Sequence, residues 1–470
     1  MTPSTSSSSP VVIDFDGILS QYTGNAIIDR LLCIAETTTS GDVARDALRQ
    51  VKAAIERGGV DEFSKPKTSN GVAYKRAKTL AEELKITDVD FADEWLDDNS
   101  KRAKAELVEL EKFLSEKITE RVNENIRMQF VELGDHYYDK GDLKNALAYY
   151  SRTRDYCSTP KHVLFMCLRV MTVCIELKNF AHVGIHANKA HRALDEIANG
   201  DDDSVLISRA KVFCACGIAN LRMGRYKDAA NDFCSIPVEI STAYANVCST
   251  RDVALYGALC ALATFDRTEL RDVVTNNKKG AFRAHLESAS DVREIVNTFF
   301  ESKYTTLFSA LERLRPWLEH DLHLHEHISP LYKRIRDRAL IQYCEPYISV
   351  DLEVMANAFN TTSGEVQREI ASLIQNDKIA GRIDTQNNTL TSLSKNTRAN
   401  VLEQIISDGE MHEQQTRAAL LRLSLLRNDV VVRANGAGAA KDDGGAGVKP
   451  SRISSMDVSM STLGERKPLS

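Results

Sequence analysis

The sequence predicts a mainly α-helical protein, in which a tetratricopeptide-like solenoid of helical repeats precedes a winged helix and a long C-terminal helix. Apolar residues recur at intervals of three and four from about Tyr22 to Tyr343, as they do on the buried faces of successive helices. Almost no stretch in this part alternates apolar and polar residues as a half-buried strand would. After Tyr343 the pattern changes to short helices and a hairpin.

Six regions are expected along the 470 residues. They are a disordered start at 1–10, an N-terminal helical region at 11–100, the solenoid at 101–330, the winged helix at 331–395, a C-terminal bundle helix at 396–432 and a disordered tail at 433–470. The tail holds six glycines, six serines and no aromatic residue, a composition that buries too little apolar surface to fold.

Charge and hydropathy exclude two classes of partner. The net charge of −6 disfavours binding to phosphate backbones and to anionic membrane surfaces, both of which need clustered lysine and arginine. The longest mostly apolar run, Val253–Phe265, is too short to span a bilayer and fits one buried helix. The serine-rich start lacks the basic and apolar parts of a secretory signal peptide. We therefore expect no nucleic acid and no membrane partner.

The repeat prediction comes from small and aromatic residues at fixed spacing. Gly134 and Ala146 allow two helices to approach closely, Gly141 allows the turn between them, and Tyr150 fills the space beside them. A second copy has Gly217, Gly224, Ala229 and Phe233 at the same spacing, and a weaker one has Phe180, Val183, Ala187 and Ala190. The equivalent turn positions are Leu143, Phe180 and Tyr226, with the insertion Asn199–Ser204 lengthening the second interval. A plain helical bundle with chance matches is the alternative.

The region after Tyr343 predicts a winged helix. A helix at Leu352–Phe359 is followed by a capping box, Thr362 with Glu365, that starts a second helix at Gly364–Ile374. The segments Asp377–Asp384 and Thr389–Leu393 then read as the two strands of a hairpin.

This winged helix is expected to bind protein rather than DNA. Residues 351–395 hold six acidic and four basic side chains, whereas a recognition helix needs donors for base edges and cations for phosphate. The free edge of the hairpin is the candidate interface, because an unpaired strand edge can pair with another strand. In it, Ile379 and Ile383 are expected to face the helices, and Arg382 to lie on the strand ladder.

A long helix is expected from Arg398 to about Val432. Its apolar stripe candidates include Leu421 and Leu425, which are the second candidate interface. The remaining stripe candidates are Val401, Ile405, Met411 and Ala418. Such a stripe either folds back on its own chain or joins helices of other chains.

Four histidines between residues 320 and 327 form the one cluster that suggests metal chemistry. On a helix His320, His323 and His327 would share a face, so a metal site is conceivable, although a solvated helix face is favoured. The ten cysteines show no C-x-x-C pair and are expected to be reduced and mostly buried.

A specific zinc mechanism is excluded by spacing. JAMM-type metalloproteases place a Ser eight and an Asp eleven residues after the second His of a His-x-His pair. Counting from His325 gives Lys333 and Arg336, so a cation stands where the metal-binding Asp belongs. The sequence also lacks a phosphate-binding Walker loop, a G-x-S-x-G elbow and an H-E-x-x-H helix. No catalytic residue, cofactor or metal site is therefore expected.

Several stretches together resemble the family of COP-nine signalosome subunit one, whose members carry a PCI domain. These stretches are Leu133–Tyr137, Ala146 with Ser151–Cys157, Tyr256–Arg267, Glu301–Tyr304 and Arg338–Tyr343, together with Tyr22–Gly24 and Arg30-Leu31 near the start. The resemblance extends from about Tyr22 to Val432 and implies a PCI domain over about residues 250–415.

The resemblance implies a non-catalytic scaffold subunit in a complex that removes the ubiquitin-like modifier Nedd8 from cullins, and so regulates cullin-RING ubiquitin ligases. It further implies that the isopeptidase is a different, JAMM-type subunit, that PCI subunits two and three are neighbours, and that the complex is nuclear and cytoplasmic. The paralogous PCI subunit of the proteasome lid has the same architecture and is the alternative.

Overall fold

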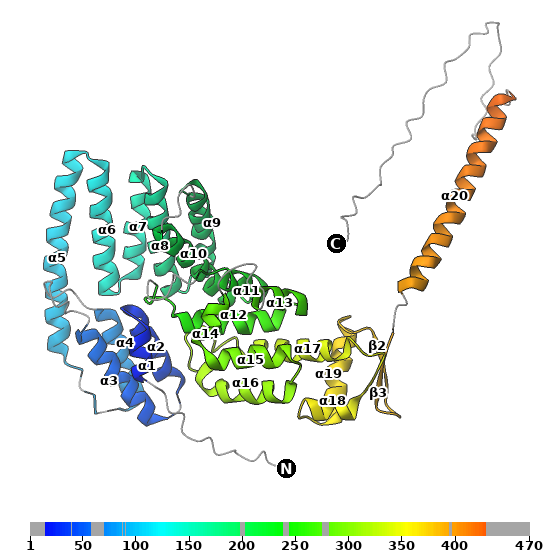
Figure 1. The fold of residues 1–470 in the computed structure, drawn as a ribbon. Helices are drawn as coiled ribbons and strands as arrows, with labels where there is room; N and C mark the ends of the chain where they lie inside the picture. The colour runs from blue at the N-terminus through cyan, green and yellow to red at the C-terminus, as the bar shows by residue number, and fades with distance from the viewer. Residues whose placement is uncertain are drawn as a thin grey trace, which may run out of the picture. The chain divides into compact units, whose positions relative to one another are not determined.

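A computed structural model describes residues 15–38, 40–57, 70–86, 88–89, 91–197, 203–237, 244–274, 282–393 and 397–428. The chain divides into two units, 1–394 and 395–470, which are described separately. The expected disordered segments 1–10 and 433–470 lie outside the described residues, as does most of the insertion after Ile197. The first unit is almost entirely helical (Figure 1).

Four N-terminal helices form a small core of their own. They are α1 (Phe15–Gln21), α2 (Asn25–Thr37), α3 (Gly41–Arg57) and α4 (Gly71–Glu83). Leu31, Leu48 and Tyr74 are fully buried in this core, and the ring of Trp95 stacks on Tyr74 with centroids 4.5 Å apart. Trp95 belongs to α5, which begins at Asp93, so the boundary expected at residue 100 falls within a continuous helix.

The repeat body continues as successive helices that lie side by side (Figure 1). Its helices are α5 (Asp93–Glu120), α6 (Asn123–Lys140), α7 (Leu143–Arg152), η1 (Thr153–Tyr156), α8 (Pro160–Glu176), α9 (Phe180–Ile197), α10 (Asp203–Arg222), α11 (Tyr226–Cys234), α12 (Thr250–Thr264), α13 (Arg267–Val274), α14 (Phe282–Ser288), α15 (Ser290–Phe300), α16 (Tyr304–Leu318) and α17 (Ile328–Cys344). The three turn positions of the predicted repeats are the first residues of α7, α9 and α11.

The predicted glycine contacts are present in both strong repeat copies. A Cβ atom on Gly134 would collide with the ring of Tyr150, and one on Gly217 would lie 2.8 Å from the ring of Phe233. Each hairpin turn has a glycine with positive φ, 88° at Gly141 and 74° at Gly224, where a side chain would be strained. The close approach of the paired helices therefore depends on glycine, as the repeat pattern predicted.

Two apolar helices lie in the main core. Every residue from Val253 to Ala263 in α12 is buried, which confirms one buried helix at the longest apolar run. Residues Ser204–Arg222 of α10 are long and apolar enough to cross a membrane, but more than half of them are buried inside the protein, as expected of a core helix. All ten cysteines are free thiols, and eight of them are buried.

The winged helix follows α17 and contains one strand that the sequence did not predict. Its elements are β1 (Ser349–Asp351), α18 (Leu352–Ala358), α19 (Ser363–Gln375), β2 (Gly381–Asp384) and β3 (Thr389–Ser392). The strands form an antiparallel sheet in the order β1-β3-β2, so the wing is three-stranded rather than two-stranded. β1 is short and buries only Val350, and so gives almost no alternating signal. The Glu365 carboxylate accepts from the Thr362 amide at 3.5 Å, as expected for the capping box.

The second unit contains one described helix, α20 (Thr397–Arg427), which is 31 residues long. It begins within a residue of the expected start and ends before the expected Val432, which lies outside the described residues.

Candidate assembly surfaces

β2 is an edge strand, and its hydrogen-bond register shows which backbone groups are free. Arg382 lies opposite Thr391, and Ile383 lies opposite Leu390. The Leu393 amide donates to the Ala380 carbonyl at 3.0 Å. Because bonded and non-bonded pairs alternate along an antiparallel ladder, the Arg382 amide faces β3, while the Gly381 and Ile383 backbone groups face outward.

Gly381 is itself buried, so only the outward backbone groups of Ile383 are called the wing edge below. No strand among the described residues pairs with the wing edge. The side chains of Ile379 and Ile383 are half-buried against the main core, as the sequence predicted for residues that face the helices. Arg382 is exposed, and its carbonyl accepts from the Thr391 hydroxyl at 3.2 Å. The Arg382 amide thus faces β3 within the sheet, and the free edge depends on Ile383.

The opposite edge of the sheet is β1, and apolar side chains surround it. Ile348, immediately before β1, is 76% exposed, and Tyr347 is also exposed. The Ile348 carbonyl accepts from the Ser392 amide at 2.7 Å, which fixes Ile348 beside the end of β3. Leu393, just beyond β3, is exposed as well. Exposed apolar side chains that cluster beside a sheet edge are typical of a contact surface.

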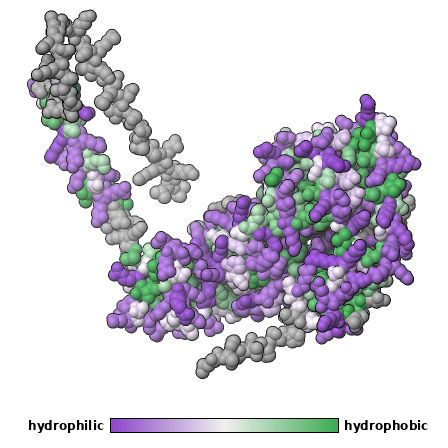
Figure 2. Space-filling model, turned by 180° about the vertical axis from the view of Figure 1, so that it is seen from behind, coloured by the Kyte–Doolittle hydropathy of each residue, from purple (hydrophilic) through white to green (hydrophobic). Residues whose placement is uncertain are grey.

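α20 exposes apolar side chains along its length (Figure 2). The exposed set comprises Val401, Leu402, Ile405, Ile406, Met411, Leu420, Leu421, Leu423 and Leu426. Leu421 is 63% exposed and Leu425 is half-buried within its own unit. Leucines and isoleucines exposed in this number on a 31-residue helix are typical of a contact surface.

The apolar residues of α20 do not form the single stripe that the sequence analysis assumed. Val401 and Ile405 are four apart and share a face, as do Leu421 and Leu425. The two pairs are twenty positions apart, however, which places them about 160° apart around a helix that turns ~100° per residue. Leu420 and Leu423 lie near the first face. The C-terminal half of α20 is therefore apolar on more than one side, a pattern of helices that are surrounded by others.

A buried charge network, which sequence reasoning missed, joins the N-terminal helices to the body. The Arg30 guanidinium on α2 bonds Asp252 Oδ2 on α12 at 2.7 Å and Asp321 Oδ2, before α17, at 3.1 Å. The Tyr22 hydroxyl donates to Asp252 at 2.7 Å, and the Tyr256 hydroxyl donates to Asp321 at 2.8 Å. No spacing rule connects three segments this far apart in sequence, so local pattern does not predict the network.

One guanidinium shared by two carboxylates sets their ionisation. Burial raises the pKa of Asp252 although Arg30 opposes the shift. Burial would also raise the pKa of Asp321, but Arg30 and the backbone amide of His323 hold it below its usual value. The network joins α2 to α12 and to the turn before α17, and so helps to fix where α2 packs on the body.

The histidine cluster is not on a helix, and the predicted solvated helix face is wrong. Residues 319–327 form turns between α16 and α17, wrapped around the buried Asp321. His320 Nδ1 bonds the Thr37 hydroxyl at 2.8 Å, and His327 Nδ1 bonds the Tyr226 hydroxyl at 3.0 Å. Within the described ranges, no group of three or more metal-ligating side chains is placed to hold an ion.

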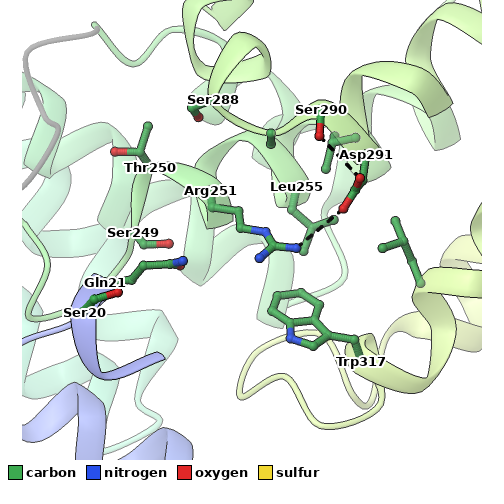
Figure 3. A pocket seen from close by; sticks show the side chains of 13 residues that line it. Ser20, Gln21, Ser249, Thr250, Arg251, Leu255, Ser288, Ser290, Asp291 and Trp317 are labelled. Carbon is green, nitrogen blue, oxygen red and sulfur yellow. Dashed lines mark hydrogen bonds and ion pairs between the residues drawn. The ribbon is translucent and has the colours of Figure 1, made fainter. Parts of the chain in front are cut away.

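A groove of about 510 Å³ lies between the end of α1 and the starts of α12 and α15 (Figure 3). The Arg251 guanidinium lies 5.0 Å from the centroid of the Trp317 ring and 3.8 Å from the Asp291 carboxylate. Ser249, Ser288 and Ser290 add hydroxyl groups, but no histidine or cysteine lines the groove. A serine hydroxyl needs an adjacent base to become a nucleophile, and here the one carboxylate faces a guanidinium.

Comparison with known proteins places this architecture in a family. Residues 92–273 match the family 26S proteasome subunit RPN7, and residues 311–394 match the PCI domain. The chain is 36% identical to COP9 signalosome complex subunit 1 of Arabidopsis thaliana over 437 residues, which cover 91% of this chain and 94% of the plant protein. The chain belongs to the COP9 signalosome subunit 1 family. This confirms the predicted resemblance and a helical-repeat protein with a PCI domain.

Other relatives separate the signalosome subunit 1 family from its proteasome paralogue. COP9 signalosome complex subunit 1b of Drosophila melanogaster is 38% identical over 339 residues, 72% of this chain and 64% of the fly protein. The 26S proteasome non-ATPase regulatory subunit 6 of Dictyostelium discoideum is only 22% identical over 340 residues, 71% of this chain and 84% of that protein. The proteasome alternative is therefore the more distant one.

Proposed function

We propose that this chain is a non-catalytic scaffold subunit of a signalosome complex that removes Nedd8 from cullins and so regulates cullin-RING ubiquitin ligases. The observation that carries the proposal is family membership over nearly the whole chain, at 36% identity to the plant protein. The partners proposed are PCI subunits two and three, the JAMM-type isopeptidase subunit and the cullin-RING ligases. The proposed location is both nucleus and cytoplasm.

The described surfaces support an assembly role. The wing edge offers the backbone N–H and C=O of Ile383 to a neighbouring strand, and edge pairing gives affinity through main-chain hydrogen bonds. α20 offers apolar faces on more than one side, which suits a bundle built from helices of several chains. Both surfaces lie at the C-terminal end of the sequence, so the repeat body remains available for other contacts.

Mass spectrometry of the native complex captured with the full chain tests the proposal. Signalosome subunits and cullins should be recovered in stoichiometric amounts, and the purified chain alone should not cleave neddylated cullin. Recovery of proteasome lid and base subunits instead would favour the paralogue. Cleavage by the isolated chain would overturn the scaffold assignment.

A further inference from the structure

A groove of about 440 Å³ lies between α17, the end of α12 and the turn before β2, and it is called the basic groove below. It is lined by Ala263, Arg334, Asp337, Arg338, Ile341 and Lys378. Three of its four charged side chains are cations. The α17 residues of the wall lie three, four and seven positions after the first of them, and so share one face of that helix. The repeat body and the winged helix thus form a mainly positive wall together.

Arg334 is the wall cation that has no ion pair or hydrogen bond among the residues that the structure describes. It is exposed, and the central carbon of its guanidinium lies 4.6 Å from the centroid of the Tyr226 ring. Tyr226 is buried, and its hydroxyl bonds His327 Nδ1 at 3.0 Å, so the ring is a fixed support. A guanidinium stacked on a ring keeps the N–H groups at its edge free, and these can bond a carboxylate in pairs.

The other two wall cations are each paired with one carboxylate. The Arg338 guanidinium pairs with Asp266, just before α13, and its Nε donates to the Phe265 carbonyl at 3.2 Å. Lys378 Nζ lies 3.4 Å from the Asp337 carboxylate. Three cations therefore face two carboxylates, and the excess positive charge is that of the stacked guanidinium. The same contacts hold the side chains in place, which lowers the entropy cost of binding.

The size of the basic groove and the spacing of its cations fit a polypeptide better than a single small anion. The groove has room for about fifteen water molecules at the ~30 Å³ that each occupies in the liquid, more than one inorganic anion fills. Arg334 and Arg338 are four positions apart on α17, or ~6 Å along the helix axis. Alternate residues of an extended segment are ~6.6 Å apart and point to the same side.

We propose that the basic groove binds an extended acidic segment of another protein, with carboxylates at alternate positions. One carboxylate would accept from the free edge of the Arg334 guanidinium. The next would contact the N–H groups of Arg338 and Lys378 that the wall carboxylates leave unused. The inference goes beyond the proposed function, because it gives the chemistry of a partner for a surface distinct from the wing edge and α20.

Calorimetric titration of the purified full chain with defined peptides tests the groove. The acetylated and amidated peptide SESES carries two glutamates at alternate positions and should bind at low ionic strength. SQSQS has nearly the same shape without the charges and should not bind. Binding of SESES should also be lost in 1 M salt, where the Debye length is about 3 Å.

Variants decide whether SESES binds in the basic groove. Arg334→Gln should weaken binding at least about tenfold, or ~1.4 kcal/mol, and Lys378→Gln should weaken it less. Arg334→Lys keeps the charge but cannot bond a carboxylate in pairs, so it should fall between Arg334→Gln and the native chain. Arg152→Gln is the matched control, because the exposed Arg152 guanidinium also lies over a tyrosine ring, that of Tyr149 at 5.2 Å, but on α7 and outside the groove. It should bind as the native chain does, and circular dichroism checks the fold of each variant.

Four results would overturn the inference. They are failure of SESES to bind at millimolar concentration, equal binding of SQSQS, unchanged binding by Arg334→Gln, and displacement of SESES by an equal concentration of inorganic phosphate. The last result would assign the groove to a free anion instead of a protein segment. None of these results depends on whether the chain assembles into a signalosome complex, so the inference and the proposed function stand or fall separately.

Discussion

At the scale of single residues, Arg30 joins α2 to the repeat body through two buried ion pairs. Its guanidinium is the shared cation for Asp252 and Asp321, and all three side chains are at most 7% exposed. Replacing Arg30 with Met leaves two buried carboxylates without their cation, which should cost roughly 3–5 kcal/mol of unfolding free energy. Urea unfolding of the full chain measures this loss.

An exposed arginine provides the control for Arg30→Met. Arg76 pairs with Glu36 at the surface, and its replacement by Met should cost at most about 1 kcal/mol. Equal losses for the two variants would show that the buried network contributes little. Adding Asp252→Asn and Asp321→Asn to Arg30→Met should restore part of the stability, because the uncompensated charges are then removed.

Glu176 makes stability depend on pH in the opposite way to an ordinary paired carboxylate. Burial, followed by the nearby Asp29, raises its pKa from 4.5 to about 8. Folding therefore favours the protonated form of Glu176. Its contribution to the free energy of unfolding is fully present at low pH and is lost as the pH rises from 4.5 to about 8. Glu176→Gln should thus raise the free energy of unfolding by roughly 1–3 kcal/mol at about pH 8 and leave it unchanged at about pH 4. The melting temperature at the two pH values measures the difference.

The exposed Glu120 is the comparison for Glu176→Gln. Its carboxylate accepts from Lys117 at 2.9 Å, and this hydrogen bond lowers the pKa of Glu120. Glu120→Gln should give no gain in melting temperature at alkaline pH. A pH-independent gain for Glu176→Gln would mean that its carboxylate is not desolvated in the folded protein.

At the scale of elements, two neighbouring amides of β2 have different roles, because the Arg382 amide faces β3 and the Ile383 amide faces outward. Ile383→Pro removes an outward N–H, which an edge strand tolerates, whereas Arg382→Pro removes an N–H that bonds β3. We expect Ile383→Pro to keep the fold and weaken incorporation into the complex. Arg382→Pro should lower the stability of the winged helix itself, by ~1–3 kcal/mol. Native mass spectrometry and thermal melting distinguish these effects.

Packing must be separated from edge pairing in this test. Ile383 is half-buried, so Ile383→Val serves as the control for lost contact without loss of the amide. It should assemble normally. If Ile383→Pro also assembles normally, the wing edge is not used by a partner.

α20 offers a second test at the element scale. Leu421→Asp with Leu425→Asp and Leu420→Asp with Leu423→Asp place charges on different sides of the helix. Because these side chains are mostly exposed within their own unit, both variants should keep their helical circular dichroism. Buried in a bundle, each pair of charges costs several kcal/mol, so both should lose incorporation.

The outcome for the two pairs shows how many sides of α20 are covered. If only one of the two double variants loses incorporation, only one face of α20 is buried in the complex. Gln404→Asp with Gln414→Asp is the control at polar positions and should assemble normally. Normal assembly by both leucine variants would exclude α20 as an interface.

At the scale of the whole molecule, the two units should be independent in stability. The buried residues of the main core all precede Ser394. A chain truncated after Ser394 should therefore melt as the full chain does but fail to join the complex, because α20 is missing. Truncation after Val432 should change neither property. A lower melting temperature for the first truncation would show that α20 stabilises its own body.

The sequence by itself determined the features that repeat or alternate locally. Glycines at 134 and 217, the starts of α7, α9 and α11, and the helix–turn–helix–hairpin order all follow from spacing, because short-range contacts constrain neighbouring residue types. It also identified the family, since those stretches occur together in one order. The residues proposed at the wing and in α20 remain predictions for the experiments above.

Only the tertiary structure decided the features that depend on distant segments. β1 has three residues and becomes a strand only beside β3, and so the third strand of the sheet could not be assigned from local sequence alone. Arg30, Asp252 and Asp321 meet across about 290 residues. The histidines after α16 lie in turns, where the Asp321 carboxylate accepts from the backbone amides of His323 and Leu324. Charges and loops are placed by the packing of whole helices, and local spacing carries no record of that packing.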